Sequence, residues 1–385
     1  MSRPAGYALT RLKLRSFRNH ASLTLETSAP VVVLHGPNGA GKTNILEALS
    51  FLAPGRGLRR AVSEDVRRSG SPEGSAWSVN ALISAGDSET MIGTGPKPGA
   101  VGDSQSRIVR IDRSPAASVA ELADYVRILW VTPAMDGLFT GPPGDRRRFL
   151  DRLVLTLDPD QGRRVNAFEK LMRDRNRLLA EDTLRGPWLD AIEMQMAENA
   201  VAIAAGRVEM VGRLAAQTTR EHVSIDAGGG AFPWAELSLA GTVEQRLENA
   251  TATTVEDAYR DMLAESRSLD RAAGRTLDGP HRTDFLVRHG PKAIDARLAS
   301  TGEQKALLLG LILAQARLVA ESVNGFAPLM LMDEIAAHLD ADRRSALFDR
   351  LIALGGQAWL TGTDRSLFSA VAGRADMFQL PFETA

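Results

Sequence analysis

Short runs of consecutive apolar residues mark the buried strands of this chain. One run covers residues 31–34 and another covers 329–332, and polar or glycine residues follow each of them closely. Strands buried on both faces of a parallel sheet have this pattern. The sequence also predicts strands at residues 8–15, 21–26, 77–83, 107–112 and 357–360. We therefore expect an α/β fold.

The middle of the chain changes to a helical period. Apolar residues repeat at spacings of three and four over 165–179 and again over 188–203. A Gly-Pro pair at residue 186 separates the two runs, which predicts a helical hairpin. A third helix is predicted at 243–265. Residues 84–106 are rich in Gly, Ser and Pro, and this composition predicts a mobile hairpin or loop.

The change of period divides the chain. A length of 385 residues favours two domains over one. We expect the α/β head to be built from residues 1–144 and 271–385. Residues 145–270 are then an inserted helical arm domain.

Composition excludes several classes of protein. There is no Cys, which rules out disulfides, zinc ribbons and thiol catalysis and is compatible with a reducing compartment. No secretory signal is visible, and no apolar run is long enough to span a bilayer. We expect a cytoplasmic protein without a membrane partner. The formal net charge of −1 means that any nucleic-acid site must be a local basic patch.

The apolar strand at residues 31–34 leads into a glycine-rich loop with the pattern G-x-x-x-x-G-K-[ST]. The loop comprises Gly36, Pro37, Asn38, Gly39, Ala40, Gly41, Lys42 and Thr43. A glycine-rich turn without a ligand would fit the same letters, but a strand before it and a helix after it favour a phosphate loop. We expect these residues to bind ATP, with Lys42 at the β and γ phosphates and Thr43 on Mg²⁺.

A second buried strand ends in two acids. Asp333 and Glu334 follow the apolar run 329–332 at the carboxyl end, where α/β sheets bind ligands. We expect Asp333 to bind Mg²⁺ and Glu334 to polarise the attacking water; two solvated acids are the alternative. Asp340 either lies near the site or caps the next helix.

A polar turn precedes the long apolar helix near the C-terminal end. It reads Ser300-Thr301-Gly302-Glu303-Gln304. A helix N-terminus suits an anion, although Ser300 and Glu303 also fit a capping box. Together with the phosphate loop and the acidic strand, this order resembles ABC-type ATPases, whose signature motif the turn resembles.

Further stretches resemble one family in particular. They are LKLRSFRNHASLTLE (12–26), HGPNGAGKTNILEALSFLAPGRGLRRA (35–61), GDRRRFLDRL (144–153), LDGPHRTDF (277–285) and STGEQKALLLGLILAQARL (300–318). These resemble RecF, a family of bacterial recombination mediators with an SMC-like ATPase head. The resemblance covers nearly the whole chain in the order of the family.

The resemblance implies a function in recombinational repair and replication-fork maintenance. ATP would close a head-to-tail homodimer, in which each nucleotide meets Lys42 of one chain and Ser300 and Gly302 of the other. The dimer would bind single- and double-stranded DNA without sequence preference, at gaps and at single-strand/double-strand junctions. It would act with RecR and RecO to help load RecA.

The resemblance also implies a weak, DNA-stimulated ATPase that acts as a switch. Thr363 stands where transporters carry a switch His, and the stretch 130–138 has no Q-loop Gln. Both departures predict slow hydrolysis. Asp136 is a candidate replacement for the Gln.

Residues 146–185 carry eleven basic and seven acidic residues. A basic stripe on a helical arm suits phosphate contacts, but an Arg-rich solvated helix face has the same composition. The RecF resemblance favours DNA, and we expect contacts from Arg146, Arg147 and Arg148.

Two other functions compete with a DNA clamp. The ATPase subunit of a membrane transporter would need a switch His and a short insert, and neither is present. A metabolic P-loop kinase would leave the turn at Ser300 unexplained.

Overall fold

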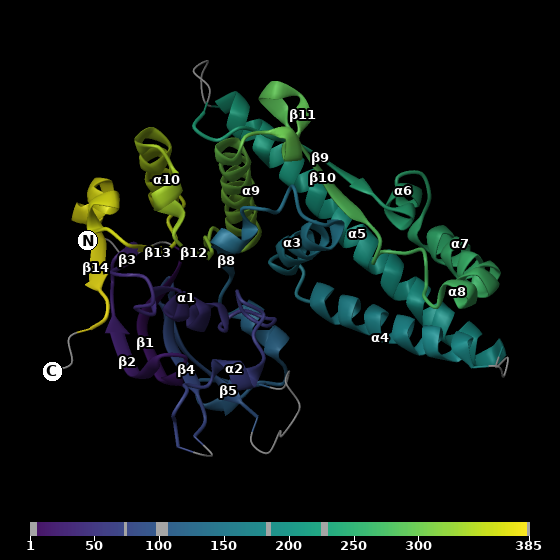
Figure 1. Ribbon diagram of the computed structural model, residues 1–385, viewed down its shortest axis with the longest axis horizontal. Helices are drawn as coiled ribbons and strands as arrows, with labels where there is room; N and C mark the ends of the chain where they lie inside the picture. Colours follow the sequence, from purple (N-terminus) through teal and green to yellow (C-terminus); the bar gives the residue numbers. More distant parts are fainter. Residues whose placement is uncertain (1–5, 73–74, 98–106, 182–185, 225–229, 383–385) are drawn as a thin grey trace. The chain divides into compact units, whose positions relative to one another are not determined.

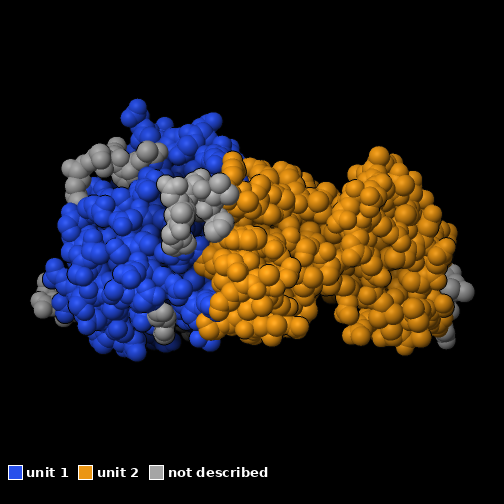
Figure 2. Space-filling view, turned by 90° about the horizontal axis from the view of Figure 1, so that it is seen from above, with its two compact units in different colours: residues 1–136, 227–232, 301–385 blue, residues 137–226, 233–300 orange. Residues whose placement is uncertain are grey.

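The computed structural model describes residues 6–72, 75–97, 107–181, 186–224 and 230–382. It forms two compact units (Figure 2). Unit 1 comprises residues 1–136, 227–232 and 301–385, and unit 2 comprises 137–226 and 233–300. The boundaries predicted for the head (1–144 and 271–385) and the arm (145–270) stay a prediction of which segments fold as domains.

A parallel five-stranded sheet forms the centre of unit 1 (Figure 1). Its order is β14 (Ala375–Gln379), β3 (Val31–His35), β13 (Ala358–Gly362), β12 (Leu329–Met332) and β8 (Ile128–Val131). β3, β13, β12 and β8 are buried along their whole length, as their apolar sequences require. Because neighbouring strands run parallel, the residues that follow β3, β13 and β12 meet at one edge.

An antiparallel sheet is the second layer of unit 1. Its order is β2 (His20–Glu26), β1 (Tyr7–Phe17), β4 (Ser78–Ala85), β5 (Ser88–Pro96), β6 (Arg107–Ile111) and β7 (Ser114–Pro115). Within the stretch 84–106, predicted as a mobile hairpin or loop, β4 and β5 pair as an antiparallel hairpin, and 98–106 lies outside the described residues. Gly93 and Gly95 lie within β5. A Cβ at Gly93 would lie 2.8 Å from Asn80 Oδ1, and a Cβ at Gly95 would lie 2.8 Å from the carbonyl oxygen of Trp77, so neither position has room for a side chain.

Helices and 3-10 turns complete unit 1. They are α1 (Lys42–Ser50), α2 (Ser63–Val66), η1 (Val119–Asp124), η2 (Pro133–Met135), α9 (Thr301–Ser322), η5 (Ile335–His338), α10 (Ala341–Ala353) and η6 (Arg365–Arg374). Apolar residues of α1 share one core with both sheets. The polar turn predicted at 300–304 is instead the first turn of α9, since Glu303 and Gln304 continue the helix.

Unit 2 consists of a helical hairpin, shorter helices and a three-stranded sheet. Its helices are α3 (Pro143–Leu155), α4 (Gln161–Ala180), α5 (Gly186–Ser224), α6 (Thr242–Leu247), α7 (Ala252–Glu265) and α8 (Arg267–Ala273). Its strands are β11 (Ile294–Asp295), β10 (Asp284–His289) and β9 (Ala235–Ala240), with the 3-10 turns η3 (Gly290–Lys292) and η4 (Ala296–Leu298). The single helix predicted at 243–265 is wrong, because α6 ends at Leu247 and Thr251 caps a second helix, α7, by accepting a bond from Thr254 N.

A buried arginine fixes the helical hairpin of unit 2. The Arg175 side chain is fully buried, and it donates to Glu193 at 2.8 Å and to Asp270 at 2.6 Å. It also donates to the hydroxyl of Thr276 and to the carbonyl of Leu263. A buried charge needs hydrogen-bonded partners to be stable. Because the partners of Arg175 come from three other helices, this one residue links α4, α5, α7 and α8.

A buried glutamine joins the two sheets of unit 1. Gln357, which immediately precedes β13, is fully buried. Its Oε1 accepts bonds from Leu9 N and from Trp359 Nε1, and its Nε2 donates to the carbonyls of Leu9 and Ala29. These four bonds satisfy the whole amide, so the side chain ties β1 to the central strand β13.

We expect Gln357→Leu to lower the free energy of unfolding by about 3 kcal/mol, because two donors and two acceptors would be buried without partners. Urea unfolding followed by circular dichroism measures this loss. The matched control is Gln245→Leu at an exposed position, which should change stability by less than about 0.5 kcal/mol. Equal losses in the two variants would contradict the assigned role of Gln357.

Candidate nucleotide site

The glycine-rich loop connects β3 to α1 through a backbone that glycine alone adopts easily. Gly36, Gly39 and Gly41 have φ values of 145°, 81° and 98°. A Cβ on Gly36 would lie 2.1 Å from the carbonyl oxygen of Leu380, so this position also excludes any side chain. The loop therefore brings its backbone N–H groups to the N-terminus of α1, where an anion is stabilised.

Lys42 holds its ammonium group within this loop. The side chain is 4% exposed, and Nζ donates to the carbonyls of Gly36 at 2.8 Å and Pro37 at 3.0 Å. The same ammonium lies 3.8 Å from the Glu334 carboxylate. The positive charge is thus fixed at the centre of the loop before any phosphate contacts it.

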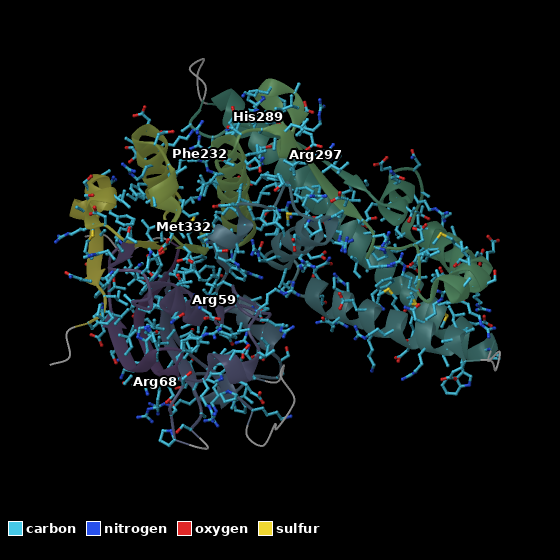
Figure 3. The ribbon with its side chains drawn as sticks, viewed as in Figure 1. Arg59, Arg68, Phe232, His289, Arg297 and Met332 are labelled. Atoms are coloured by element: carbon cyan, nitrogen blue, oxygen red, sulfur yellow. The ribbon has the colours of Figure 1, made fainter. Side chains whose placement is uncertain are left out.

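The Asp333 carboxylate, which directly follows β12, joins the end of β13 to the start of α1. The Thr43 hydroxyl donates to it at 2.8 Å from the start of α1, and the Thr361 hydroxyl donates at 2.8 Å from β13. Burial raises the pKa of Asp333, while the bonds from Thr361 and Thr43 act in the opposite direction. Figure 3 labels Met332, the residue before Asp333 at the end of β12.

Glu334 has an unusual backbone conformation. Its φ is 52°, in the left-handed region that non-glycine residues rarely adopt. Glu334 N donates to the Thr361 hydroxyl at 2.8 Å, and the side chain is 32% exposed. The carboxylate therefore lies beside Lys42 and remains accessible to solvent.

A magnesium ion fits the oxygens of Thr43 and Asp333. Mg²⁺ prefers oxygen ligands and usually takes one or two from the protein, with phosphates and water as the others. A hydroxyl hydrogen-bonded to a buried carboxylate supplies two such oxygens. Among the described residues there is no group of three or more His, Cys, Asp or Glu side chains that could hold a metal without a phosphate.

Three polar side chains at the mouth of the loop were not predicted. Asn19 donates to the carbonyl of Ala40 and accepts a bond from Asn44, and His20 Nε2 lies 3.3 Å from the carbonyl of Gly41. Burial lowers the pKa of His20, which favours its neutral form, while the bond to the carbonyl of Gly41 acts in the opposite direction. These contacts attach the β1–β2 turn to the loop. The residues belong to the stretch SFRNH (16–20), whose sequence did not indicate that it would contact the loop.

A buried carboxylate on α1 organises two arginines nearby. Glu47 is fully buried and pairs with Arg18 at 2.7 Å and with Arg59 at 3.1 Å. Arg59, labelled in Figure 3, also donates to Asn44 Oδ1 at 2.7 Å. Glu47 thereby holds the segment after α1 against the helix that carries Lys42 and Thr43.

Asp136 and Ser300 both lie near the first turns of α9, the helix that follows the signature-like turn. Asp136, the candidate Q-loop replacement, pairs with Lys305 in α9 at 3.1 Å. Ser300 is exposed and directly precedes α9, and Gly302 is in its first turn. Asp340 caps α10 by accepting a bond from Arg343 N at 2.8 Å, which answers the question left open for that residue.

The three arginines predicted to contact DNA lie on α3 in unit 2. Arg146 pairs with Asp284 at 2.7 Å and donates to the carbonyls of Phe139 and Gly141. Arg147 donates to the carbonyl of Thr283 at 2.9 Å. Arg148 pairs with its neighbour Asp145 and has a side chain that is 51% exposed. Two of the three thus use donors within unit 2, and Arg148 is the most accessible.

No helix in the described ranges is both long and apolar enough to cross a bilayer.

Comparison with known proteins gives concordant matches. The family model for the RecF/RecN/SMC N terminal domain matches residues 8–374. A protein named DNA replication and repair protein RecF from Agrobacterium fabrum is 54% identical over 97% of this chain and 96% of its own length. The protein of the same name from Rhizobium meliloti is 54% identical over 95% of each chain.

Solved structures show the same fold at lower identity. The recombination mediator RecF with bound ATPrS has a TM-score of 0.83 at 21% identity, over 99% of this chain and 98% of its own. The Smc head domain from Pyrococcus furiosus has a TM-score of 0.51 at 14% identity, over 94% of this chain and 92% of its own. The predicted α/β fold of an ABC-type, SMC-like ATPase head is confirmed.

We expect Thr361→Val to weaken Mg²⁺-dependent ATP binding, because the variant keeps the shape of the side chain but loses its bond to Asp333. Without that donor the pKa of Asp333 rises further above its ordinary value, so protonation displaces Mg²⁺ at a higher pH than in the wild type. Apparent Mg²⁺ affinity should fall about tenfold, and most at acidic pH.

Calorimetric titration between pH 6 and pH 8 measures this effect. Thr363→Val, at an exposed position two residues along the chain, is the control and should behave like the wild type. An identical pH dependence in Thr361→Val and the wild type would show that the Thr361 bond does not tune Asp333.

Proposed function

This chain belongs to the RecF family of SMC-type ATPases, and on that premise we propose that it is an ATP-dependent DNA-binding protein of DNA replication and repair. The observation that carries the proposal is the convergence of Thr43, Thr361 and Lys42 on the two acids that follow β12. Asp333 meets two hydroxyls, and Glu334 lies 3.8 Å from the Lys42 ammonium. A phosphate loop, a cation site and a carboxylate that solvent can reach are the parts that ATP hydrolysis requires.

In this proposal the loop from Gly36 to Thr43 binds the phosphates of ATP. Backbone N–H groups and the fixed ammonium of Lys42 neutralise phosphate charge. Thr43 and Asp333 hold Mg²⁺, which supplies further positive charge at the phosphates when it is bound. Glu334, accessible at the same edge, orients the attacking water and accepts its proton.

The second half of the site comes from another copy of the chain. One phosphate loop and one signature-like turn occur in the sequence, and we propose that Ser300 and Gly302 of one protomer bind the γ-phosphate held by its partner. ATP then closes a homodimer and slow hydrolysis releases it. The N-terminus of α9 supports this role, because its first N–H groups favour an anion.

DNA is the proposed ligand of the closed dimer, at gaps and at single-strand/double-strand junctions. The relatives are named for DNA replication and repair. We extend the proposal to contacts from Arg146, Arg147 and Arg148, to partnership with RecR and RecO in loading RecA, and to action in the cytoplasm.

Mixing two inactive variants tests the shared site. Lys42→Ala removes the ammonium from the loop, and Ser300→Arg blocks the γ-phosphate position of the partner, so neither variant alone should hydrolyse ATP. A 1:1 mixture should recover turnover, because each heterodimer contains one intact site built from Lys42 of one protomer and Ser300 of the other. Steady-state ATPase assays and sedimentation with ATP measure the outcome. Normal turnover and dimerisation of Ser300→Arg by itself would rule out the shared site.

Replacing Arg146, Arg147 and Arg148 with Gln separates DNA contact from folding. If all three contact phosphates, the salt dependence of DNA affinity should decrease by about 2.7 in log–log slope, and Arg148→Gln alone should account for about 0.9. Arg146→Gln should also lower stability, since it breaks the ion pair with Asp284. Fluorescence anisotropy at several salt concentrations and thermal unfolding measure both. A triple variant that is destabilised but keeps its slope would make these residues purely structural.

A further inference from the structure

The edge strand of the parallel sheet ends directly against the phosphate loop. β14 pairs in parallel with β3, and its last residue, Gln379, lies opposite His35 (Figure 1). Leu380 extends the pairing by one residue, because its N–H donates to the carbonyl of His35 at 2.7 Å. The segment 380–382 therefore lies beside Gly36, the first residue of the loop.

Both neighbouring strands hold the peptide unit that enters the loop. Its carbonyl, that of His35, accepts the bond from Leu380 on the β14 side, and its N–H, that of Gly36, donates to the carbonyl of Gly362 at 3.3 Å on the β13 side. The Leu380 backbone also lies against Gly36 itself. A Cβ at Gly36 would lie 2.1 Å from the Leu380 carbonyl oxygen and 3.3 Å from its nitrogen. Gly36 is thus enclosed from two sides.

Gly36 connects this contact to the charge at the centre of the site. Its carbonyl accepts a bond from Lys42 Nζ at 2.8 Å, and the carbonyl of Pro37 accepts another at 3.0 Å. A displacement of Gly36 would move both acceptors that orient the ammonium group. Because a site binds well only when supporting residues fix its geometry, the position of Leu380 affects phosphate binding through Gly36 and Lys42.

One buried side chain attaches this segment to the rest of unit 1. Leu380 is 1% exposed, whereas Gln379 and Pro381 on either side of it are exposed. The Leu380 side chain belongs to the same hydrophobic core as Leu34 of β3 and Ile45 of α1. It therefore shares a core with the strand before the phosphate loop and with the helix after it.

β14 can separate from the sheet more easily than the inner strands. In the described part of the sheet it pairs with β3 alone. Its residues are half-buried or exposed, whereas β3 is buried along its whole length. Elements with few buried contacts open at lower free energy than the centre of a fold. A ligand that requires the closed arrangement stabilises it in return, because such coupling is reciprocal.

We propose that Leu380 is a positioning residue for ATP binding, an inference that rests on the nucleotide function proposed above. Its buried side chain holds the segment 380–382 against the sheet, and its backbone fixes Gly36. Gly36 in turn holds Lys42 toward the phosphates. ATP binding and the pairing of β14 are then linked, so that each stabilises the other.

Leu380→Ala tests the assignment through ATP affinity. The variant keeps every residue of the nucleotide site but weakens the attachment of the segment, so the Kd for ATP in the presence of Mg²⁺ should rise about tenfold. Leu380→Met preserves the volume of the side chain and should bind ATP like the wild type. Calorimetric titration below the unfolding midpoints of all variants measures the three affinities.

Leu122→Ala is the matched control. Leu122 is 0% exposed in the same core, and it lies in η1, shortly before β8 at the opposite edge of the parallel sheet. Both alanine variants should lower the thermal unfolding midpoint, but Leu122→Ala should keep the wild-type Kd for ATP. An unchanged Kd in Leu380→Ala, or an equal rise in the two alanine variants, would overturn the assignment.

Hydrogen exchange of the unaltered protein gives a test that does not depend on the folding of a variant. Saturating ATP with Mg²⁺ should slow exchange of the Leu380 amide about tenfold, by the same coupling. The amides of α7 in unit 2 should exchange at the same rate with and without ATP. An unchanged rate at Leu380 would overturn the link between β14 and the loop. Absence of ATP binding by the wild type would instead overturn the proposed function itself.

Discussion

The nucleotide site depends on one buried carboxylate. Asp333 is 4% exposed, and burial alone would favour its neutral form. The hydroxyls of Thr43 and Thr361 keep the charge in place, but they can reach it only when β3, β13 and β12 lie side by side in register. The geometry of the site therefore depends on the correct pairing of these three parallel strands. Gln357 directly precedes β13, and its amide ties the start of this strand to β1. The same central strand therefore positions Thr361 at one end and joins the two sheets at the other.

Buried arginines join the helices of unit 2 to one another. Arg175 and Arg207 have 0% and 3% exposed side chains, and each meets two carboxylates. Arg207 also donates to the carbonyl of Pro280, and Arg147 donates to that of Thr283. The stretch 279–285 thus supplies backbone acceptors to an Arg-rich interior. This explains why much of the arginine in this region stabilises structure rather than forming a solvated surface.

The sequence predicted the parts of the site that are local in the chain. The phosphate loop, the acids after β12 and the helices around residue 186 follow from spacing and period, because neighbouring residues determine them. The contacts of Gln357 with Leu9 and of Thr43 with Asp333 join residues 348 and 290 positions apart, and no local pattern encodes such pairs. The prediction at 84–106 left a hairpin and a loop open, because the Gly-rich composition does not show that β4 approaches Gly93 and Gly95 too closely for a side chain. The partners of Arg146 and Arg147, the Asp284 carboxylate and the Thr283 carbonyl, are likewise distant in the sequence, so no local pattern indicated them.

The order of strands has a consequence for synthesis on the ribosome. β3 lies between β13 and β14, which come from the last 30 residues of the chain. Leu380 N donates to the carbonyl of His35 at 2.7 Å, directly before the phosphate loop. Until those residues have emerged, an apolar strand near the N-terminus has both edges unpaired and is exposed to mispairing. The nascent chain thus carries its nucleotide loop without the neighbouring strands that position it for almost its entire translation.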